Sequence, residues 1–178
     1  MAKKKNEGKQ FEDDFKKSVP MYAFIYRFKD GTASWSDNVC PKCKTQLVSN
    51  TRFQAQNICD FMVFNNPHLY FLELKSTKSK SLPFSAVREN QKKELTEAGR
   101  RKNISAGLVV NFRELDETYY MSIELFNECM EKLTSKSIPV KTFREYAILI
   151  DQEQKQVHWR YNIDGFFKKK ETEVSNLF

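Results

Sequence analysis

The stretch that most constrains the fold of this chain is HLYFLELKS, residues 68–76. It would suit a buried strand, except that Glu73 lies within it and Lys75 follows two residues later. Because side chains alternate between the two faces of a strand, Glu73 and Lys75 project from one face and Leu72 and Leu74 from the other. The pattern therefore predicts a strand with one core face and one face that carries an acid and a base.

A second strand-like run, ICDFMVF at residues 58–64, precedes the first and is separated from it by the turn signal NNP. The two runs are expected to form an antiparallel hairpin. Asp60 lies in the first run among apolar neighbours, where a carboxylate is costly to bury unless something neutralises it. Two carboxylates on adjacent strands repel each other, and a divalent cation relieves that repulsion. Asp60 and Glu73 are therefore candidate metal ligands.

An aspartate followed by Glu-x-Lys at the end of the next strand resembles the pattern of the restriction-endonuclease-like nucleases, written PD-(D/E)xK. Carboxylate-bound Mg²⁺, for which Mn²⁺ can substitute, polarises a scissile phosphate and lowers the pKa of a bound water. Lys75 is the candidate catalytic lysine, which would orient that water and stabilise developing negative charge. The alternative is a surface ion pair between Glu73 and Lys75, with Asp60 an isolated polar residue.

Two further residues are candidate metal ligands from helices. The sequence predicts a helix over residues 85–102, with Ser85 as its cap and Gln91 on its apolar stripe. The amide oxygen of Gln91 would join the metal or its water network. Glu12 lies on a predicted N-terminal helix beside Phe11 and would add a carboxylate. The alternative for both is an ordinary solvated position on a helix.

The chain has a net charge of +7 and a pI near 9.2, which favours an anionic partner, above all nucleic acid. Basic residues bracket the proposed site in the loop and helix that follow it. The candidate DNA-binding residues are Lys78, Lys80, Arg88, Lys92, Lys93, Arg100 and Arg101. Backbone phosphates would be contacted without reading the base sequence. The alternative is a solvated charged surface.

These residues together resemble the RecU-like Holliday junction resolvases of Gram-positive bacteria and their phages. The resemblance rests on LELKSTKSKSLPFSAVRENQKKEL, then GLVVNF, then YYMSIELF. It implies that Asp60, Glu73 and Gln91 bind metal, that Lys75 is catalytic, and that Glu12 matches an acidic first helix. The chain departs from the family at Ile58, where a hydroxyl residue is usual.

The resemblance implies a homodimer that cuts four-way DNA junctions by paired nicks. Two other functions remain open at this stage: a nuclease of the same fold with another DNA target, of restriction or exonuclease type, and a non-catalytic protein that binds branched DNA. No apolar run reaches the length of a membrane span, and the N-terminus lacks the apolar core of a signal peptide. We therefore expect a cytoplasmic protein without membrane contact.

The order of predicted elements gives an α/β domain with one mixed central sheet flanked by helices, as in restriction endonucleases. Residues 1–9 are expected to be a basic flexible tail, and residues 10–178 a single nuclease domain. Residues 31–57 form an irregular insertion, and its CPKC motif places Cys40 and Cys43 at the spacing of half a zinc site. Cys59 or a histidine could complete it, or two subunits could each donate a pair. Reduced loop thiols are the favoured interpretation.

Overall fold

The computed structural model describes residues 7–28, 42–43 and 57–175. Its helices are α1 (Glu7–Ser18), η1 (a 3-10 turn, Phe84–Ala86), α2 (Glu89–Gly99), α3 (Ile123–Lys132), α4 (Val140–Tyr146) and α5 (Ile163–Ser175). Its strands are β1 (Phe24–Arg27), β2 (Phe61–Asn65), β3 (His68–Thr77), β4 (Ser81–Pro83), β5 (Ile104–Phe112), β6 (Glu117–Ser122), β7 (Ser137–Pro139), β8 (Ile148–Ile150), β9 (Gln152–Lys155) and β10 (His158–Tyr161). None of the described helices is long and apolar enough to cross a membrane.

Six of the strands form the central sheet, in the order β1-β2-β3-β5-β6-β8. Strand β3 runs parallel to β5 and antiparallel to β2, and the remaining neighbours in the sheet are antiparallel. Helix α2 lies in the crossover from β3 to β5, as a parallel pair requires. The predicted α/β class with a mixed central sheet is confirmed.

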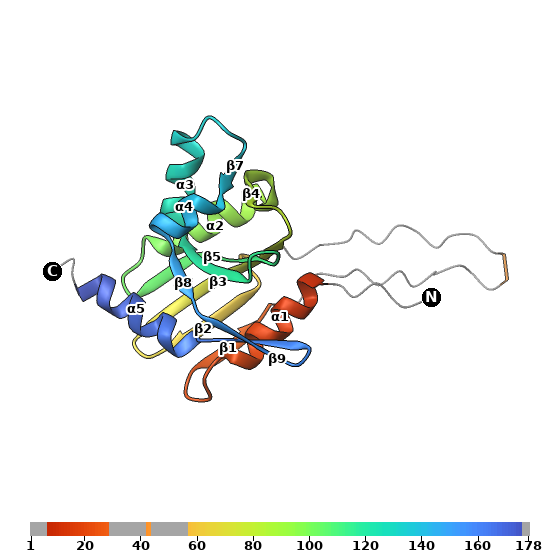
Figure 1. Cartoon of the computed structure of the whole chain (residues 1–178), viewed down its shortest axis with the longest axis vertical. Coiled ribbons are helices and arrows are strands. Elements are labelled where there is room, and N and C mark those ends of the chain that lie inside the picture. Colours follow the sequence, from red (N-terminus) through yellow and green to blue (C-terminus); the bar gives the residue numbers. More distant parts are fainter. Residues whose placement is uncertain (1–6, 29–41, 44–56, 176–178) are drawn as a thin grey trace.

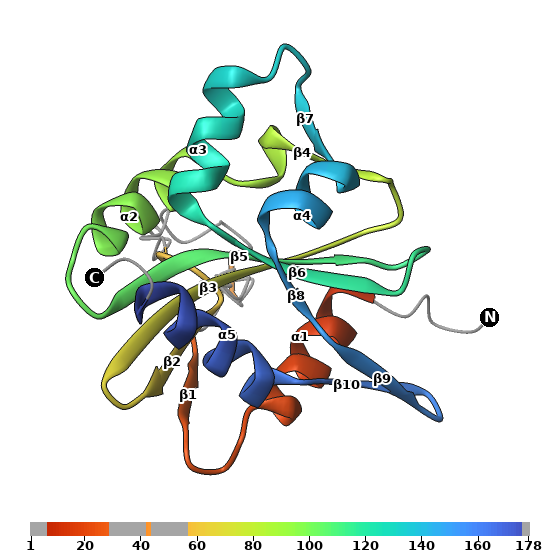
Figure 2. The same ribbon diagram turned by 60° about the vertical axis from the view of Figure 1, so that its left-hand side comes forward.

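Helices cover both faces of this sheet (Figures 1 and 2). On one face, α2, α3 and α4 pack over a cluster that includes Leu95, Leu108 and Phe126. On the other face, α1 and α5 pack over a cluster that includes Phe15, Leu72 and Phe166. We call these the α2/α3 face and the α1/α5 face.

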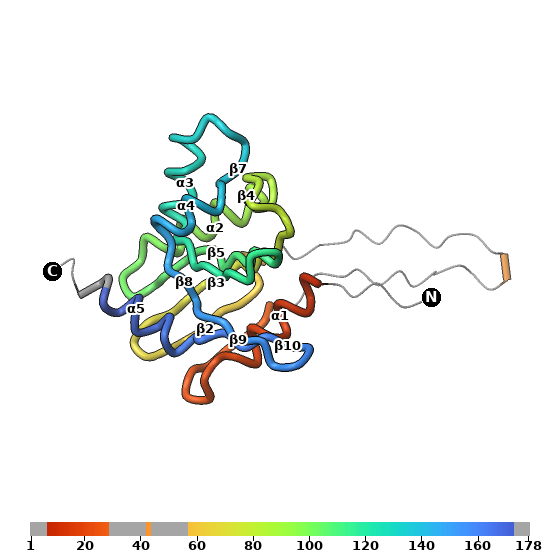
Figure 3. The backbone as a smooth tube through the Cα atoms, viewed as in Figure 1, coloured from red at the N-terminus to blue at the C-terminus, as the bar shows by residue number. Residues whose placement is uncertain are grey.

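The first helix has the apolar face that its sequence predicts. Phe11 and Phe15, four residues apart, are buried on the α1/α5 face, and both rings pack against Tyr161 of β10. The trace in Figure 3 shows the β9–β10 hairpin running past the sheet beside α1. Helix α1 begins at Glu7, so the last three residues of the predicted tail are helical.

The predicted hairpin of β2 and β3 is confirmed, with Phe61 opposite Leu72. The prediction for the two faces of β3 needs a correction, because both faces are covered. Leu72 and Leu74 are buried on the α1/α5 face, as expected, but Glu73 on the opposite face is only 1% exposed. The carboxylate of Glu73 therefore lies inside the protein, at the edge of the apolar cluster on the α2/α3 face.

Helix α2 is shorter than the predicted helix at both ends. Ser85 lies in the 3-10 turn instead of capping α2, and the helix begins at Glu89 after Arg88 in an extended conformation. Tertiary pairing explains the late start, because β4 just upstream pairs with β7, with Leu82 opposite Ile138. The helix ends at Gly99, before the predicted end at residue 102, and Arg100 follows it in a right-handed helical conformation.

The C-terminal region is regular. It contains β7, α4 and β8, then the β9–β10 hairpin and helix α5. Phe166 and Phe167 of α5 are buried against Tyr70 of β3. Basic and apolar residues share this helix, so its high charge makes the apolar face difficult to recognise from the sequence.

Candidate functional site

The candidate site lies where β2 begins and β3 approaches its end. Extending the register by one residue beyond the Phe61–Leu72 pair puts Asp60 opposite Glu73. Directly opposed residues of an antiparallel pair share one face and have Cβ atoms about 5 Å apart. In the parallel pair with β5, Glu73 lies beside Leu108, which belongs to the α2/α3 cluster. The two carboxylates are thus neighbours on the α2/α3 face.

Glu73 and Lys75 form an ion pair, with 2.6 Å between Nζ and Oε1. The side chain of Glu73 is 2% exposed and that of Lys75 is 23% exposed, so this is not the surface pair considered as the alternative. The second carboxylate oxygen, Oε2, is buried and has no hydrogen-bond partner. A buried acceptor without a partner is rare in native proteins and requires an explanation.

Asp60 is held in place by the backbone around it. Its Oδ2 accepts a hydrogen bond from the amide of Leu74 at 2.8 Å, and its carbonyl accepts one from the amide of Phe28 at 2.9 Å. Asp60 is therefore fixed between β1 and β3 in front of Glu73. The backbone thus anchors a second carboxylate on the strand next to that of Glu73.

Cys59 adds a buried thiol next to the two acids. Burial raises the pKa of this thiol, and the charges of Glu73 and Asp60 raise it further. The thiol is consequently protonated at neutral pH and donates to the carbonyl of Phe61 at 3.2 Å. With 2% exposure, Cys59 is a core thiol.

The chemistry of these donors suits a hard divalent cation. Mg²⁺ takes oxygen ligands and is held through one or two carboxylates while it keeps several waters. Asp60 and the unpartnered Oε2 of Glu73 offer such a set. Within the described ranges no group of three or more His, Cys, Asp or Glu side chains is arranged as a metal cluster. The candidate centre therefore consists of two protein carboxylates, and amide oxygens or water would have to supply the remaining ligands of a cation.

Gln91 lies in the first turn of α2, on the same face of the sheet as Glu73, and is buried with 8% exposure. Its Oε1 accepts a hydrogen bond from the amide of Arg88 at 3.1 Å and so caps the helix. The oxygen expected to serve a metal thus has a structural partner. Burial rules out the interpretation of Gln91 as an ordinary exposed glutamine.

Glu12 approaches this end of the sheet from the opposite face. Its carboxylate is bound by Arg27 of β1, with 3.0 Å from Nε and 2.5 Å from Nη2 to Oε2. Arg27 pairs across the sheet with Phe61, the residue after Asp60. Arg27 was not identified from the sequence alone. Alternation along β1 could have indicated it, because Arg27 lies two residues after Ile25 and therefore on the same α1/α5 face.

The predicted DNA-binding cations fall into two groups. In the first group, acids lie nearby: Lys92 pairs with Glu89 at 2.6 Å, and Arg100 and Arg101 pair with Glu97 at 3.2 and 3.4 Å. Lys78, in the loop after β3, lies 3.5 Å from Glu7. In the second group, Lys80, Arg88 and Lys93 are exposed, and no ion pair is seen for them within the described residues.

The possible zinc site cannot be assembled from the described residues. Cys43 is exposed, and Cys40 lies outside the described ranges, as does most of the insertion at residues 31–57. The pairing of Cys40 with Cys43 stays a prediction. Cys129 is also buried, with 7% exposure.

Comparison with known proteins gives one relative and one structural neighbour of note. The chain is 29% identical over 185 residues to the SPbeta prophage-derived uncharacterized protein YotM of Bacillus subtilis, and this match covers 93% of the chain and 89% of the relative. A structure of Hjc, a Holliday junction resolvase from Archaeoglobus fulgidus, aligns with a TM-score of 0.40 and 13% identity. That alignment covers 57% of this chain and 78% of Hjc.

The family described as Recombination protein U, or RecU, matches residues 6–164. The match spans every element from α1 to β10, including the β2–β3 hairpin with Asp60, Glu73 and Lys75. It also contains the polar insertion between β1 and β2. This chain is therefore a member of the RecU family.

Proposed function

We propose that this chain is a Mg²⁺-dependent endonuclease that resolves four-way (Holliday) junctions by paired strand nicks during recombination and repair. The observation that carries the proposal is the buried, unpartnered Oε2 of Glu73 in front of Asp60. Membership of a recombination-protein family agrees with it. A purely architectural DNA-binding protein would have no use for an acid that remains unsatisfied inside the fold.

Asp60 and Glu73 are the residues that would hold the cation, with Gln91 contributing to its outer shell and Glu12 a weaker candidate. Bound Mg²⁺ would polarise the scissile phosphate and lower the pKa of a water, and Mn²⁺ would serve as well. Lys75 keeps its ammonium against Oε1 of Glu73, where it can stabilise negative charge developing on the phosphate. The Leu74 amide keeps Asp60 from turning away.

The exposed cations would bind the phosphate backbone of branched DNA. We expect Lys80, Arg88 and Lys93 to contribute more than Lys78, Lys92, Arg100 and Arg101, whose nearby acids must be displaced. Each phosphate contact that is lost lowers the slope of log affinity against log salt by about 0.9. Lys80→Ala should show this change, and Lys155→Ala on the distant β9 should not.

We also propose that the protein acts as a homodimer in the bacterial or phage-infected cytoplasm. Strand β1 lies at the edge of the sheet, and its Phe24 and Tyr26 are 56% and 45% exposed. Phe64 of β2, which lies opposite Phe24 of β1, is 42% exposed. An apolar surface on an edge strand is typical of an interface between subunits. Sedimentation of wild type and of Phe24→Lys tests this: a dimer should become a monomer.

The function is tested by incubating the protein with a labelled four-way junction and with a linear duplex of the same sequence, in Mg²⁺ and in EDTA. Paired nicks confined to the junction and lost in EDTA are the expected result. Cutting of both substrates would leave a nuclease but refute junction selectivity. Tight junction binding without cutting would support the architectural alternative and refute the proposed enzyme.

A further inference from the structure

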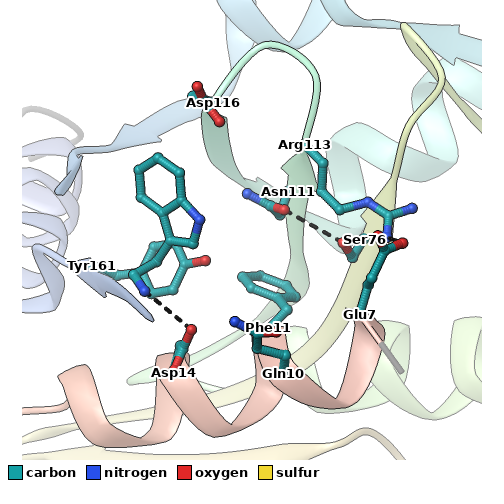
Figure 4. A pocket seen from close by; sticks show the side chains of 10 residues that line it. Glu7, Gln10, Phe11, Asp14, Ser76, Asn111, Arg113, Asp116 and Tyr161 are labelled. Atoms are coloured by element: carbon teal, nitrogen blue, oxygen red, sulfur yellow. Dashed lines mark hydrogen bonds and ion pairs between the residues drawn. The ribbon is translucent and has the colours of Figure 1, made fainter. Parts of the chain in front are cut away.

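The α1/α5 face contains a small cavity that the proposed nuclease chemistry does not use (Figure 4). It lies between the first half of α1, the ends of β3 and β5, the β5–β6 turn and β10, and has a volume of about 170 Å³. Pockets for drug-sized molecules begin at roughly 300 Å³. The cavity is therefore suited to a ligand of about one ring system.

Aromatic rings form the apolar part of the wall. Phe11 and Tyr161 meet edge to face with ring centroids 5.4 Å apart, and Trp159 also lines the cavity. Stacking on such rings is how proteins hold an unstacked nucleic-acid base, because every base has a π face. The shape and the wall thus fit a planar ring.

A directional chain of hydrogen bonds borders the cavity. Ser76 donates to Oδ1 of Asn111 at 3.4 Å, Asn111 donates to Thr118 at 2.9 Å, and Thr118 donates to Oε1 of Gln152 at 2.5 Å. At its end the amide nitrogen of Gln152 is buried and unpartnered. Ser76 and the 6% exposed Asn111 themselves line the cavity. This chain fixes which way the Asn111 amide points.

Charged groups form the rim. Arg113 has a buried Nε without a partner, while its Nη1 is bound to Glu7, which also lies 3.5 Å from Lys78. Asp116, on the turn after β5, contributes an exposed carboxylate. The rim therefore offers a guanidinium, now bound to Glu7, and a carboxylate that can accept from a ligand. A phosphate at Arg113 would take the place of Glu7.

The cavity lies at the same end of β3 as the candidate catalytic site. Ser76 directly follows Lys75, so its side chain emerges from the opposite face of the same strand. The loop with Lys78 continues from there around the end of the sheet. A nucleotide next to the cleaved bond could reach the cavity by leaving the stack and passing around this end of β3.

We propose that the cavity binds a single nucleotide flipped out of the DNA next to the cleavage point and thereby gives cutting its base preference. Its base lies among the aromatic rings, and its phosphate binds Arg113. Asp116 accepts from an exocyclic amino group, as acidic residues do from cytosine, so cytosine, adenine and guanine are preferred over thymine. This inference rests on the proposed nuclease function for its biological role.

The first test does not depend on cleavage. Deoxycytidine and thymidine monophosphates are titrated against the protein while the indole N–H signal of Trp159 is followed by NMR, with Trp35→Phe used for assignment. The cytidine nucleotide should shift this signal, and Asp116→Ala, which removes the acceptor, should weaken that binding about tenfold, as loss of one good base contact does. Asp13→Ala, on the exposed side of α1, is the matched control and should bind as wild type does.

The second test measures where junctions are cut when the base next to each cleavage point is varied. Wild type should cut beside amino-bearing bases about tenfold better than beside thymine, and Asp116→Ala should reduce that ratio while Asp13→Ala preserves it. Equal nucleotide binding by wild type and Asp116→Ala, or cutting without base preference, would overturn the inference. Nucleotide binding with no junction cutting would refute the proposed nuclease and leave the nucleotide site standing.

Discussion

The two faces of β3 leave opposite kinds of polar atoms unsatisfied at the same end of one strand. On the α2/α3 face, Glu73 presents a buried acceptor that lacks a donor. Across the sheet, two buried donors lack acceptors: Nε of Arg113, which lines the cavity, and the amide nitrogen of Gln152, at the far end of the hydrogen-bond chain. Glu73 calls for a cation, and Arg113 for a ligand that carries an acceptor. A nucleotide of DNA next to a bound metal ion would supply such an acceptor through its phosphate.

The change with the largest expected effect removes the charge of Glu73. Glu73→Gln should reduce Mg²⁺-dependent junction cleavage by a factor on the order of 100 or more, since even partners of metal ligands are worth 10–100-fold. Junction binding measured in EDTA should persist. The exposed Glu114→Gln is the matched control and should cut normally. Activity in Glu73→Gln close to that of wild type would mean that this face holds no essential metal.

Lys75→Ala should rank next. It removes the ammonium that lies 2.6 Å from Glu73, and cleavage at saturating Mg²⁺ should fall roughly 100-fold, the typical loss when one stabilising donor is removed. Single-turnover cleavage rates measure the effect, with Lys141→Ala on the surface of α4 as the control. An unchanged rate would assign Lys75 a structural role alone.

On the α1/α5 face, the largest expected effect of a substitution is a loss of protein stability. Asn111→Ala breaks the hydrogen-bond chain and leaves Thr118 without its donor, which should lower the free energy of unfolding by about 2 kcal/mol. Chemical denaturation measures this change. Asn127→Ala, which loses one bond to Thr96 at a partly buried position, should cost about 1 kcal/mol or less. Equal losses of stability in the two variants would show that the hydrogen-bond chain at the cavity contributes no more than a single partly buried hydrogen bond.

The smallest expected effect is a change in DNA affinity from a substitution at the rim of the cavity. Glu7→Ala frees Arg113 and Lys78, so affinity for a four-way junction should rise a few-fold at low salt, in line with exposed pairs worth about 1 kcal/mol or less. The gain should shrink as salt screens the charges. Glu153→Ala, which frees Lys155 on β9, is the control. Weaker binding by Glu7→Ala would show that Glu7 supports the DNA surface instead of competing with phosphate.

The β2–β3 hairpin and its carboxylate pair were predictable from the sequence because both follow from alternation in two adjacent strands. The apolar runs on either side of NNP fix the register, and the register puts Asp60 opposite Glu73. The same alternation predicted that Lys75 would share a face with Glu73, and the ion pair confirms it. Local pattern was sufficient here because β2 and β3 follow each other in the chain and pair directly.

What the sequence did not predict depends on contacts between distant segments. The burial of Glu73 requires α2 and α3 to cover its face, and the late start of α2 follows from pairing of β4 with β7. Arg27 meets Glu12 only when α1 packs beside β1, and the cavity brings together α1, β5 and β10. No spacing in the chain encodes these distant contacts.

The most direct measurement is cation binding to the buried carboxylates. Mn²⁺ titrated into wild type, Glu73→Gln and Glu114→Gln can be followed by water-proton relaxation, which reports bound paramagnetic metal. We expect wild type and Glu114→Gln to bind Mn²⁺ with the same affinity, to release it when Mg²⁺ is added, and Glu73→Gln to show no site of that affinity. Equal Mn²⁺ binding by all three proteins would contradict the assignment of Glu73 as a metal ligand.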